Sequence, residues 1–141
     1  MIRHGDLVFE LPKLLLLPSD GKHHRLSEDW HVRFRGEWYS VPCGFVTDGA
    51  SIPAALRFIC GDPNKAPRIY PAILHDWGYS RGGSESDRRR YDDLYRDMQI
   101  SLGIPRFKAY VEWAALRVCG GGHFGTKNHN KKILIMKKKG K

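Results

Sequence analysis

The first third of the chain alternates between apolar and polar residues. From Trp30 to Arg35 every apolar residue is followed by a polar one, which is the period of two expected of a half-buried strand. Gly36 and Glu37 can turn the chain back into a second run at 38 to 41, so this stretch predicts a β-hairpin. Short apolar runs at 7 to 11 and at 13 to 17, followed by a polar turn at 19 to 22, predict further strands.

Beyond residue 68 the apolar spacing becomes that of helices. We predict helices at 68 to 80, from Ser84 or Ser86 to Gly103, and at 106 to 119, and Ser84 with Asp87 has the spacing of a capping box. The last two helices each carry apolar residues at i, i+3, i+4, i+7 and i+11, which we expect to face the core. These are Tyr91, Leu94, Tyr95, Met98 and Leu102 in one helix, and Phe107, Tyr110, Val111, Ala114 and Val118 in the other.

Residues 42 to 53 read PCGFVTDGASIP, a stretch too irregular for a strand, and Pro53 can open a short helix that runs to Cys60. A small N-terminal antiparallel β-sheet or set of hairpins followed by three to four helices predicts the α+β class. Residues 1 to 125 are expected to form a single domain, and 126 to 141 a basic tail.

Charge is concentrated at the C-terminus. The net charge is +9, but residues 126 to 141 contain seven lysines and no acid, so the rest of the chain carries 17 Lys and Arg against 15 Asp and Glu. Such a tail can dock onto nucleic acid, an anionic membrane or an acidic partner, and the apolar residues 133 to 136 within it favour docking. A flexible solvated terminus is the alternative.

From the sequence we expect no export signal, no membrane span and no cysteine-based site. The longest early apolar run, residues 14 to 17, is too short for a signal peptide or a membrane span. Cys43, Cys60 and Cys119 form no CxxC pair, so neither a disulfide framework nor a paired-cysteine zinc site is expected. A zinc site at Cys119, His123 and His129 matches no standard spacing.

The helix at 68 to 80 carries two different rows. Tyr70, Ile73, Leu74 and Trp77 form an ordinary apolar row, while Ala72, His75, Asp76 and Tyr79 form a second row on nearly the opposite side. An imidazole, a carboxylate and a phenol can titrate, ligate and hydrogen-bond. The second row is therefore the candidate site.

The motif HDxxY, with an aspartate on the following helix, resembles the catalytic helix pair of phospholipase A2 enzymes, especially the disulfide-free type of parvovirus capsids. VPCGFVTDGASIP, then HDWGY, then DDLYRDM more closely resembles a family of phage and prophage proteins classed as a domain of unknown function, over about residues 38 to 120. The HD pair alone also occurs in metal phosphohydrolases, but the upstream histidines here lie in turns or strands rather than helices.

The phospholipase resemblance implies roles for individual residues. His75 is the general base that takes a proton from water, Asp92 accepts from its other ring nitrogen, and Tyr79 hydrogen-bonds Asp92. Asp76 is expected to bind Ca²⁺ together with backbone carbonyls of the loop that contains Gly44, Asp48 and Gly49.

Two functions follow from these resemblances. One is a phage accessory or virion-associated protein that hydrolyses a lipid or another ester, located in the host cytoplasm or the virion. The other is a non-enzymatic structural or assembly component of a phage tail or baseplate, whose basic tail docks onto other phage proteins. In the second case the row of His75 is a buried polar network that locks the helices together.

Overall fold

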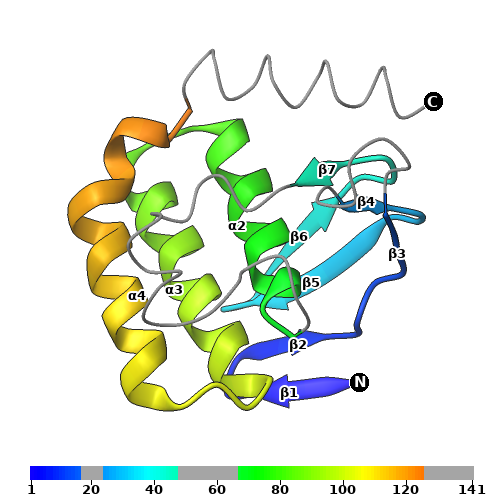
Figure 1. The fold of residues 1–141 in the computed structure, drawn as a ribbon, viewed down its shortest axis with the longest axis horizontal. Coiled ribbons are helices and arrows are strands. Elements are labelled where there is room, and N and C mark those ends of the chain that lie inside the picture. Colours follow the sequence, from blue (N-terminus) through cyan, green and yellow to red (C-terminus); the bar gives the residue numbers. More distant parts are fainter. Residues whose placement is uncertain (17–23, 48–66, 126–141) are drawn as a thin grey trace.

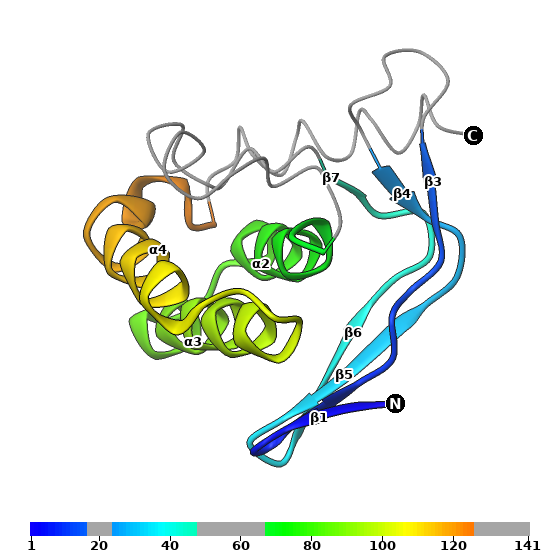
Figure 2. The ribbon, with the colours of Figure 1, turned by 60° about the horizontal axis from the view of Figure 1, so that its bottom comes forward.

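The computed structural model describes residues 1–16, 24–47 and 67–125, with the side chains of Leu15, Leu16 and His123 excepted. In these ranges strands precede helices along the chain, and Figures 1 and 2 show the strands on one side of the molecule and the helices on the other. The expected α+β class, an N-terminal antiparallel sheet followed by helices, is confirmed. Residues 126 to 141, predicted as a basic tail, lie outside the described residues.

The described strands form two antiparallel sheets. The larger sheet has the order β1-β2-β5-β6 and contains Ile2–His4, Leu7–Phe9, Trp30–Phe34 and Glu37–Val41. The smaller sheet has the order β3-β4-β7 and contains Leu14–Leu16, His24–Leu26 and Val46–Thr47. The sequence runs at 7 to 11 and 13 to 17 thus correspond to β2 and β3, whereas β1 and β4 were not predicted.

The hairpin between β5 and β6 turns one residue earlier than expected. Phe34 pairs with Glu37, and the two residues between them, Arg35 and Gly36, have φ angles of 52° and 77°. A two-residue turn with both central residues at positive φ matches the twist of the flanking strands. Along β5 buried and exposed residues alternate strictly, which confirms the predicted half-buried strand.

The irregular segment at 42 to 53 contains a strand that the sequence pattern concealed. Val46 and Thr47 pair with Arg25 and His24 of β4, and both are buried. A two-residue strand is too short to show a period, so only its pairing partner reveals it. The rest of the segment, and the helix expected from Pro53 to Cys60, lie outside the described residues.

Three α-helices follow the strands: α2 at Ile69–Arg81, α3 at Glu85–Ser101 and α4 at Arg106–Cys119, and a 3₁₀ turn, η1, spans Gly120–His123. The expected capping box starts α3: Ser84 accepts from the Asp87 amide, and the Asp87 carboxylate accepts from the Ser84 amide. The apolar row predicted for α3 is confirmed, since four of its members are buried and Leu102 packs against the core. No helix among the described residues is long and apolar enough to cross a membrane.

The prediction that the apolar row of α4 faces the core is wrong. Phe107 and Val118 are 68% and 84% exposed, and the buried positions of this helix are Ala109, Glu112 and Leu116. The row faces outward because α4 packs through a polar contact instead, in which the carboxylate of Glu112 accepts hydrogen bonds from α3. Apolar spacing alone cannot distinguish this arrangement from an ordinary core-facing helix.

Candidate functional site

The candidate site lies on α2, which is the central helix. In Figure 2 α2 lies between the strands and α4, with α3 beside it. Almost every residue from Ile69 to Tyr79 is buried, and His75, Asp76 and Tyr79 are exposed by 2% or less. A helix with neighbours on both sides buries both of its rows, which explains why the row of His75 is not a solvated face.

The three residues assigned catalytic roles lie together. His75 Nε2 is 2.7 Å from Oδ1 of Asp92, and the Tyr79 hydroxyl donates to the same oxygen at 2.6 Å. His75 and Tyr79 come from adjacent turns of α2, while Asp92 comes from α3 and is fully buried. Both hydrogen bonds expected from the phospholipase resemblance are present. Their catalytic use stays a prediction.

Two arginines hold the other side of the Asp92 carboxylate. Arg117, from α4, donates to Oδ2 at 2.8 Å, and Nη1 of Arg88 lies 3.7 Å from the same atom. Arg88 also donates to the carbonyl of Leu116 at 3.0 Å, which ties α3 to α4. The sequence pattern did not suggest that Arg117 reaches this carboxylate from the following helix. Arg81, at the end of α2, lies over the ring of Trp77.

These partners fix the protonation of Asp92. Burial acts to raise the pKa of its carboxyl, but hydrogen bonds from His75, Tyr79 and Arg117 outweigh burial, so the pKa lies below its usual value. Burial and the adjacent Asp92 carboxylate both raise the pKa of the Tyr79 phenol. Asp92 therefore stays ionised and acts as an acceptor, whereas Tyr79 stays neutral and acts as a donor.

The His75 ring is enclosed by aromatic side chains. Its centroid is 4.0 Å from that of Tyr79 and 5.2 Å from that of Tyr95. Only 1% of the residue is exposed. In this conformation the imidazole is oriented by Asp92 but is sealed from bulk solvent.

A second buried cluster, which the sequence did not suggest, lies beside the first. The carboxylate of Glu112, from α4, accepts from Tyr95 at 3.1 Å and from Gln99 at 2.7 Å, and the guanidinium of Arg68 pairs with it. Tyr95 contacts both clusters, because its ring also faces His75. The only sign in the sequence is that Glu112 falls at the centre of a helix face otherwise made of Ala109 and Leu116.

The residues expected to bind calcium are only partly described. The hydroxyl of Thr47, in β7, donates to Oδ2 of Asp76, so the short strand anchors this carboxylate. The amide of Gly44 donates to the carbonyl of Leu26 at 2.9 Å. Asp48 and Gly49 lie outside the described residues.

Calcium usually takes six to eight oxygen ligands, several of them carboxylates. Within residues 1–16, 24–47 and 67–125 there is no group of three His, Cys, Asp or Glu side chains that could hold a metal. Asp76 is the sole described side chain of the expected set, and one of its oxygens already accepts from Thr47. The described residues do not fit a calcium site.

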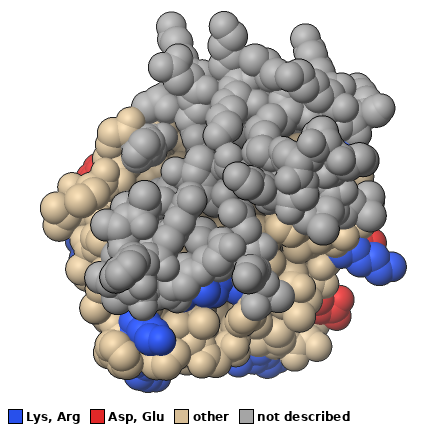
Figure 3. Space-filling model, viewed as in Figure 1, with Lys and Arg blue, Asp and Glu red and all other residues tan. Residues whose placement is uncertain are grey.

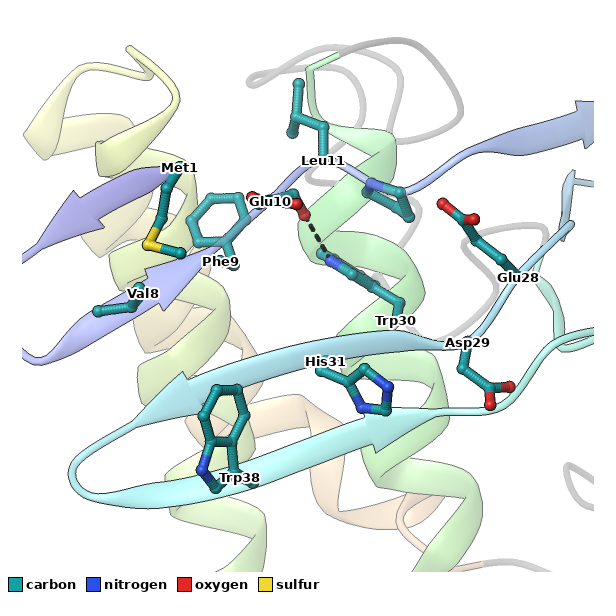
Figure 4. Close-up of a pocket in the computed structure, with 11 residues that line it drawn as sticks. Met1, Val8, Phe9, Glu10, Leu11, Glu28, Asp29, Trp30, His31 and Trp38 are labelled. Carbon is teal, nitrogen blue, oxygen red and sulfur yellow. Dashed lines mark hydrogen bonds between the residues drawn. The ribbon is translucent and has the colours of Figure 1, made fainter.

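A pocket of about 320 Å³ lies elsewhere, beside the strands of the larger sheet. Figure 4 shows Trp38 and His31 on neighbouring strands along it, and Asp29 and Glu28 farther along the same edge. Trp30 closes its inner side, and its indole donates to the carbonyl of Glu10 at 2.7 Å. Of the predicted catalytic and metal-binding residues that the structure describes, none lines this pocket.

Comparison with known proteins places the chain in a family. Residues 24–116 match the family described as "Protein of unknown function (DUF1353)". The chain is also 30% identical over 111 residues to "Uncharacterized protein y4iH" of Sinorhizobium fredii (strain NBRC 101917 / NGR234). That match covers 76% of this chain but 44% of the relative, so the chain spans less than half the length of that protein. No solved structure matches the chain significantly. Because the family match spans more than half of the chain, the chain belongs to the DUF1353 family, and the matched segment contains His75, Tyr79 and Asp92.

Proposed function

We propose that this protein is a hydrolase of a lipid or another ester, with His75 as the general base. The observation that carries the proposal is the orientation of the imidazole by Asp92. One oxygen of that carboxylate faces His75 Nε2 and Tyr79, and the other faces Arg117. A histidine held by a carboxylate that is itself held in place is the usual arrangement of a catalytic base.

The reaction follows from this orientation. With Nε2 donating to Asp92, the proton acceptor of the ring is Nδ1. Nδ1 takes a proton from water as the water oxygen attacks the ester carbonyl. When the tetrahedral intermediate collapses, the bond to the alkoxide breaks and the imidazolium returns the proton to it, so that an acid and an alcohol leave. General base catalysis of this kind contributes about 10² to 10⁴ in rate.

The biological setting is part of the same proposal. The resemblance of the TDGAS and HDxxY segments to phage and prophage proteins supports an accessory or virion-associated protein. The lysine-rich residues 126 to 141 support docking onto another phage protein or an anionic surface.

A second candidate is a non-enzymatic structural component, and the burial of His75 favours it. A residue that is 1% exposed is not open to a substrate in this conformation. Asp92 joins α2, α3 and α4 through His75, Tyr79 and Arg117. A buried polar network of this kind can serve to fix the packing of three helices.

The test is a hydrolysis assay on phospholipid vesicles and on a monomeric short-chain ester, each with added Ca²⁺ and with a chelator. Wild type is compared with His75→Gln and with the control His4→Gln, whose histidine lies on β1. We expect His75→Gln to lower the rate by about 10² or more and His4→Gln to match wild type. Background rates in all three proteins, each folded by circular dichroism, would establish the structural candidate. The chelator arm decides whether any activity depends on calcium.

A further inference from the structure

The face of α4 that points away from the molecule is apolar. Phe107, Tyr110, Val111 and Val118 are 68%, 45%, 43% and 84% exposed, and Ala114 is exposed between them. We call these five residues the outer face of α4. In both ribbon views α4 is the helix farthest from the strands. A contiguous exposed apolar patch of this kind marks a binding surface.

The outer face is as regular as the buried face of a packed helix. At about 100° per residue, its five members fall within an arc of about 100°. The buried residues Ala109, Glu112 and Leu116 lie on the opposite side of the helix. The helix therefore has two faces, one packed through Glu112 and one largely exposed apolar face, with the guanidinium of Arg96 over the ring of Tyr110.

Cationic side chains flank the outer face. On the same helical projection Lys108 lies about 100° to one side of Phe107, and Arg106 lies about as far to the other side. Arg117 lies on the side of Arg106, but it pairs with Asp92 and Glu85. Glu112 is the sole acidic residue in Arg106–Cys119, and it is buried. Arg96 of α3 lies over the rings of Tyr110 and Trp113. In Figure 3 Lys and Arg, and no Asp or Glu, are visible at the lower left, where α4 begins in Figure 1.

We propose that the outer face of α4 docks onto the surface of an anionic lipid bilayer. An apolar stripe that contains aromatic residues and is flanked by cations lies in the membrane interface, with the stripe among the acyl chains and the cations at the head groups. Tyr110 suits this depth because its ring is apolar and its hydroxyl is polar. The surface goes beyond the proposed hydrolysis and does not depend on it.

The charge pattern argues against other occupants. Two copies packed through the outer face would bring the flanking cations Arg106 and Lys108 of both copies to the edges of one interface, with no exposed acid on the helix to pair them. A nucleic acid is contacted mainly through its phosphates by cationic and polar groups and leaves an apolar stripe uncovered. An anionic bilayer can bury the apolar residues and pair with the cations at the same time.

The test is co-sedimentation of the full chain with vesicles of phosphatidylcholine alone and with vesicles that also contain phosphatidylglycerol. The variant Phe107→Ser with Val118→Ser removes the two most exposed apolar side chains of the outer face. Trp38→Ser is the matched control, because Trp38 is 65% exposed on β6. Every protein keeps residues 126 to 141, so binding by the lysine-rich tail is the same in all of them.

We expect wild type to bind the phosphatidylglycerol vesicles, Trp38→Ser to bind equally, and the double variant to bind about tenfold more weakly. Lys108→Glu should also weaken binding, and the more so at low salt. Equal binding of wild type and the double variant would assign binding to the tail and overturn the proposal, as would no binding by wild type. A wild-type dimer that the double variant turns into a monomer, measured by light scattering, would assign the face to a second copy.

The monomeric ester separates this proposal from the proposed function. Hydrolysis of that ester requires no bilayer, so the double variant should keep the wild-type rate on it. If wild type binds vesicles but hydrolyses nothing, docking stands and the hydrolase proposal fails. If wild type hydrolyses the ester but the double variant binds vesicles as wild type does, the docking proposal fails.

Discussion

Gly78 of α2 lies against the ring of Tyr91 of α3, so closely that a Cβ on Gly78 would be 2.5 Å from two ring carbons. This contact sets the approach of the two helices that carry His75 and Asp92. Gly78→Ala would ordinarily stabilise a helix by about 1 kcal/mol. Here we expect it to destabilise the fold by about 1 to 3 kcal/mol through overpacking, measured by urea denaturation.

The same denaturation assay has two controls. Gly122→Ala, where a Cβ meets nothing within 4 Å, should change the free energy of unfolding by no more than about 0.5 kcal/mol. Adding Tyr91→Leu to Gly78→Ala should recover part of the loss, because the smaller side chain makes room for the methyl group. A Gly78→Ala protein as stable as wild type would show that the helices can separate at no cost.

On α4 a charged residue is buried and the apolar row is exposed. Substituting the charged residue should therefore cost more stability than substituting an apolar one. Glu112→Gln removes the charge that pairs with Arg68 and weakens the acceptor of Tyr95, so it should cost about 3 kcal/mol of stability. Val111→Ser, one residue away and 43% exposed, should cost about 0.5 kcal/mol or less. Urea denaturation of both variants measures the two values. The reverse order would mean that the apolar row of α4 faces the core after all.

The sequence was informative where one physical rule acted alone. Strict alternation identified β5, and the capping box of Ser84 and Asp87 located the start of α3. The two rows of α2, together with the resemblance, brought His75, Tyr79 and Asp92 together correctly.

The sequence-based predictions failed where contacts between distant parts of the chain determine the structure. Which face of α4 packs inward depends on the hydrogen bonds that Glu112 accepts from Tyr95 and Gln99. No local sequence pattern indicates these hydrogen bonds. Arg117 reaches Asp92 from 25 residues away, and on its own helix it looks like an ordinary surface cation. Long-range polar pairing is thus the part of the site that spacing arguments miss.

Asp92→Asn tests the cluster that orients His75. The substitution keeps the size of the side chain but removes a fully buried charge that accepts from His75, Tyr79 and Arg117. We expect a loss of about 3 kcal/mol in the free energy of unfolding, because the arginine cations are left without their partner.

The matched control is Asp97→Asn on the same helix. Its carboxylate is 22% exposed and pairs with Arg96, and its loss should cost about 1 kcal/mol or less. If urea denaturation gave similar losses of unfolding free energy for both variants, the hydrogen bonds of Asp92 would contribute no more to stability than an ordinary surface ion pair.

The lowered pKa of Asp92 predicts an acid-sensitive fold. The carboxyl pKa is below its usual value in the folded state, so between the two pKa values the unfolded chain binds more protons and stability rises with pH. The contribution of Asp92 is complete above the ordinary carboxyl pKa of about 4 and is lost as the pH falls through the folded value. The pKa of Glu85 is likewise lowered, to about 2, by hydrogen bonds from Arg88 and Arg117.

Urea denaturation of wild type and Asp92→Asn at a series of pH values measures this dependence. The difference in unfolding free energy between the two proteins should be constant near neutral pH and shrink as the pH falls below about 4. Glu85→Gln should leave most of the acid loss in place, because Glu85 is exposed and its ion pairs are screened by solvent. A difference between wild type and Asp92→Asn that stays the same down to the acid end would mean that Asp92 keeps an ordinary pKa in the fold, and that the hydrogen bonds around it contribute nothing through its charge.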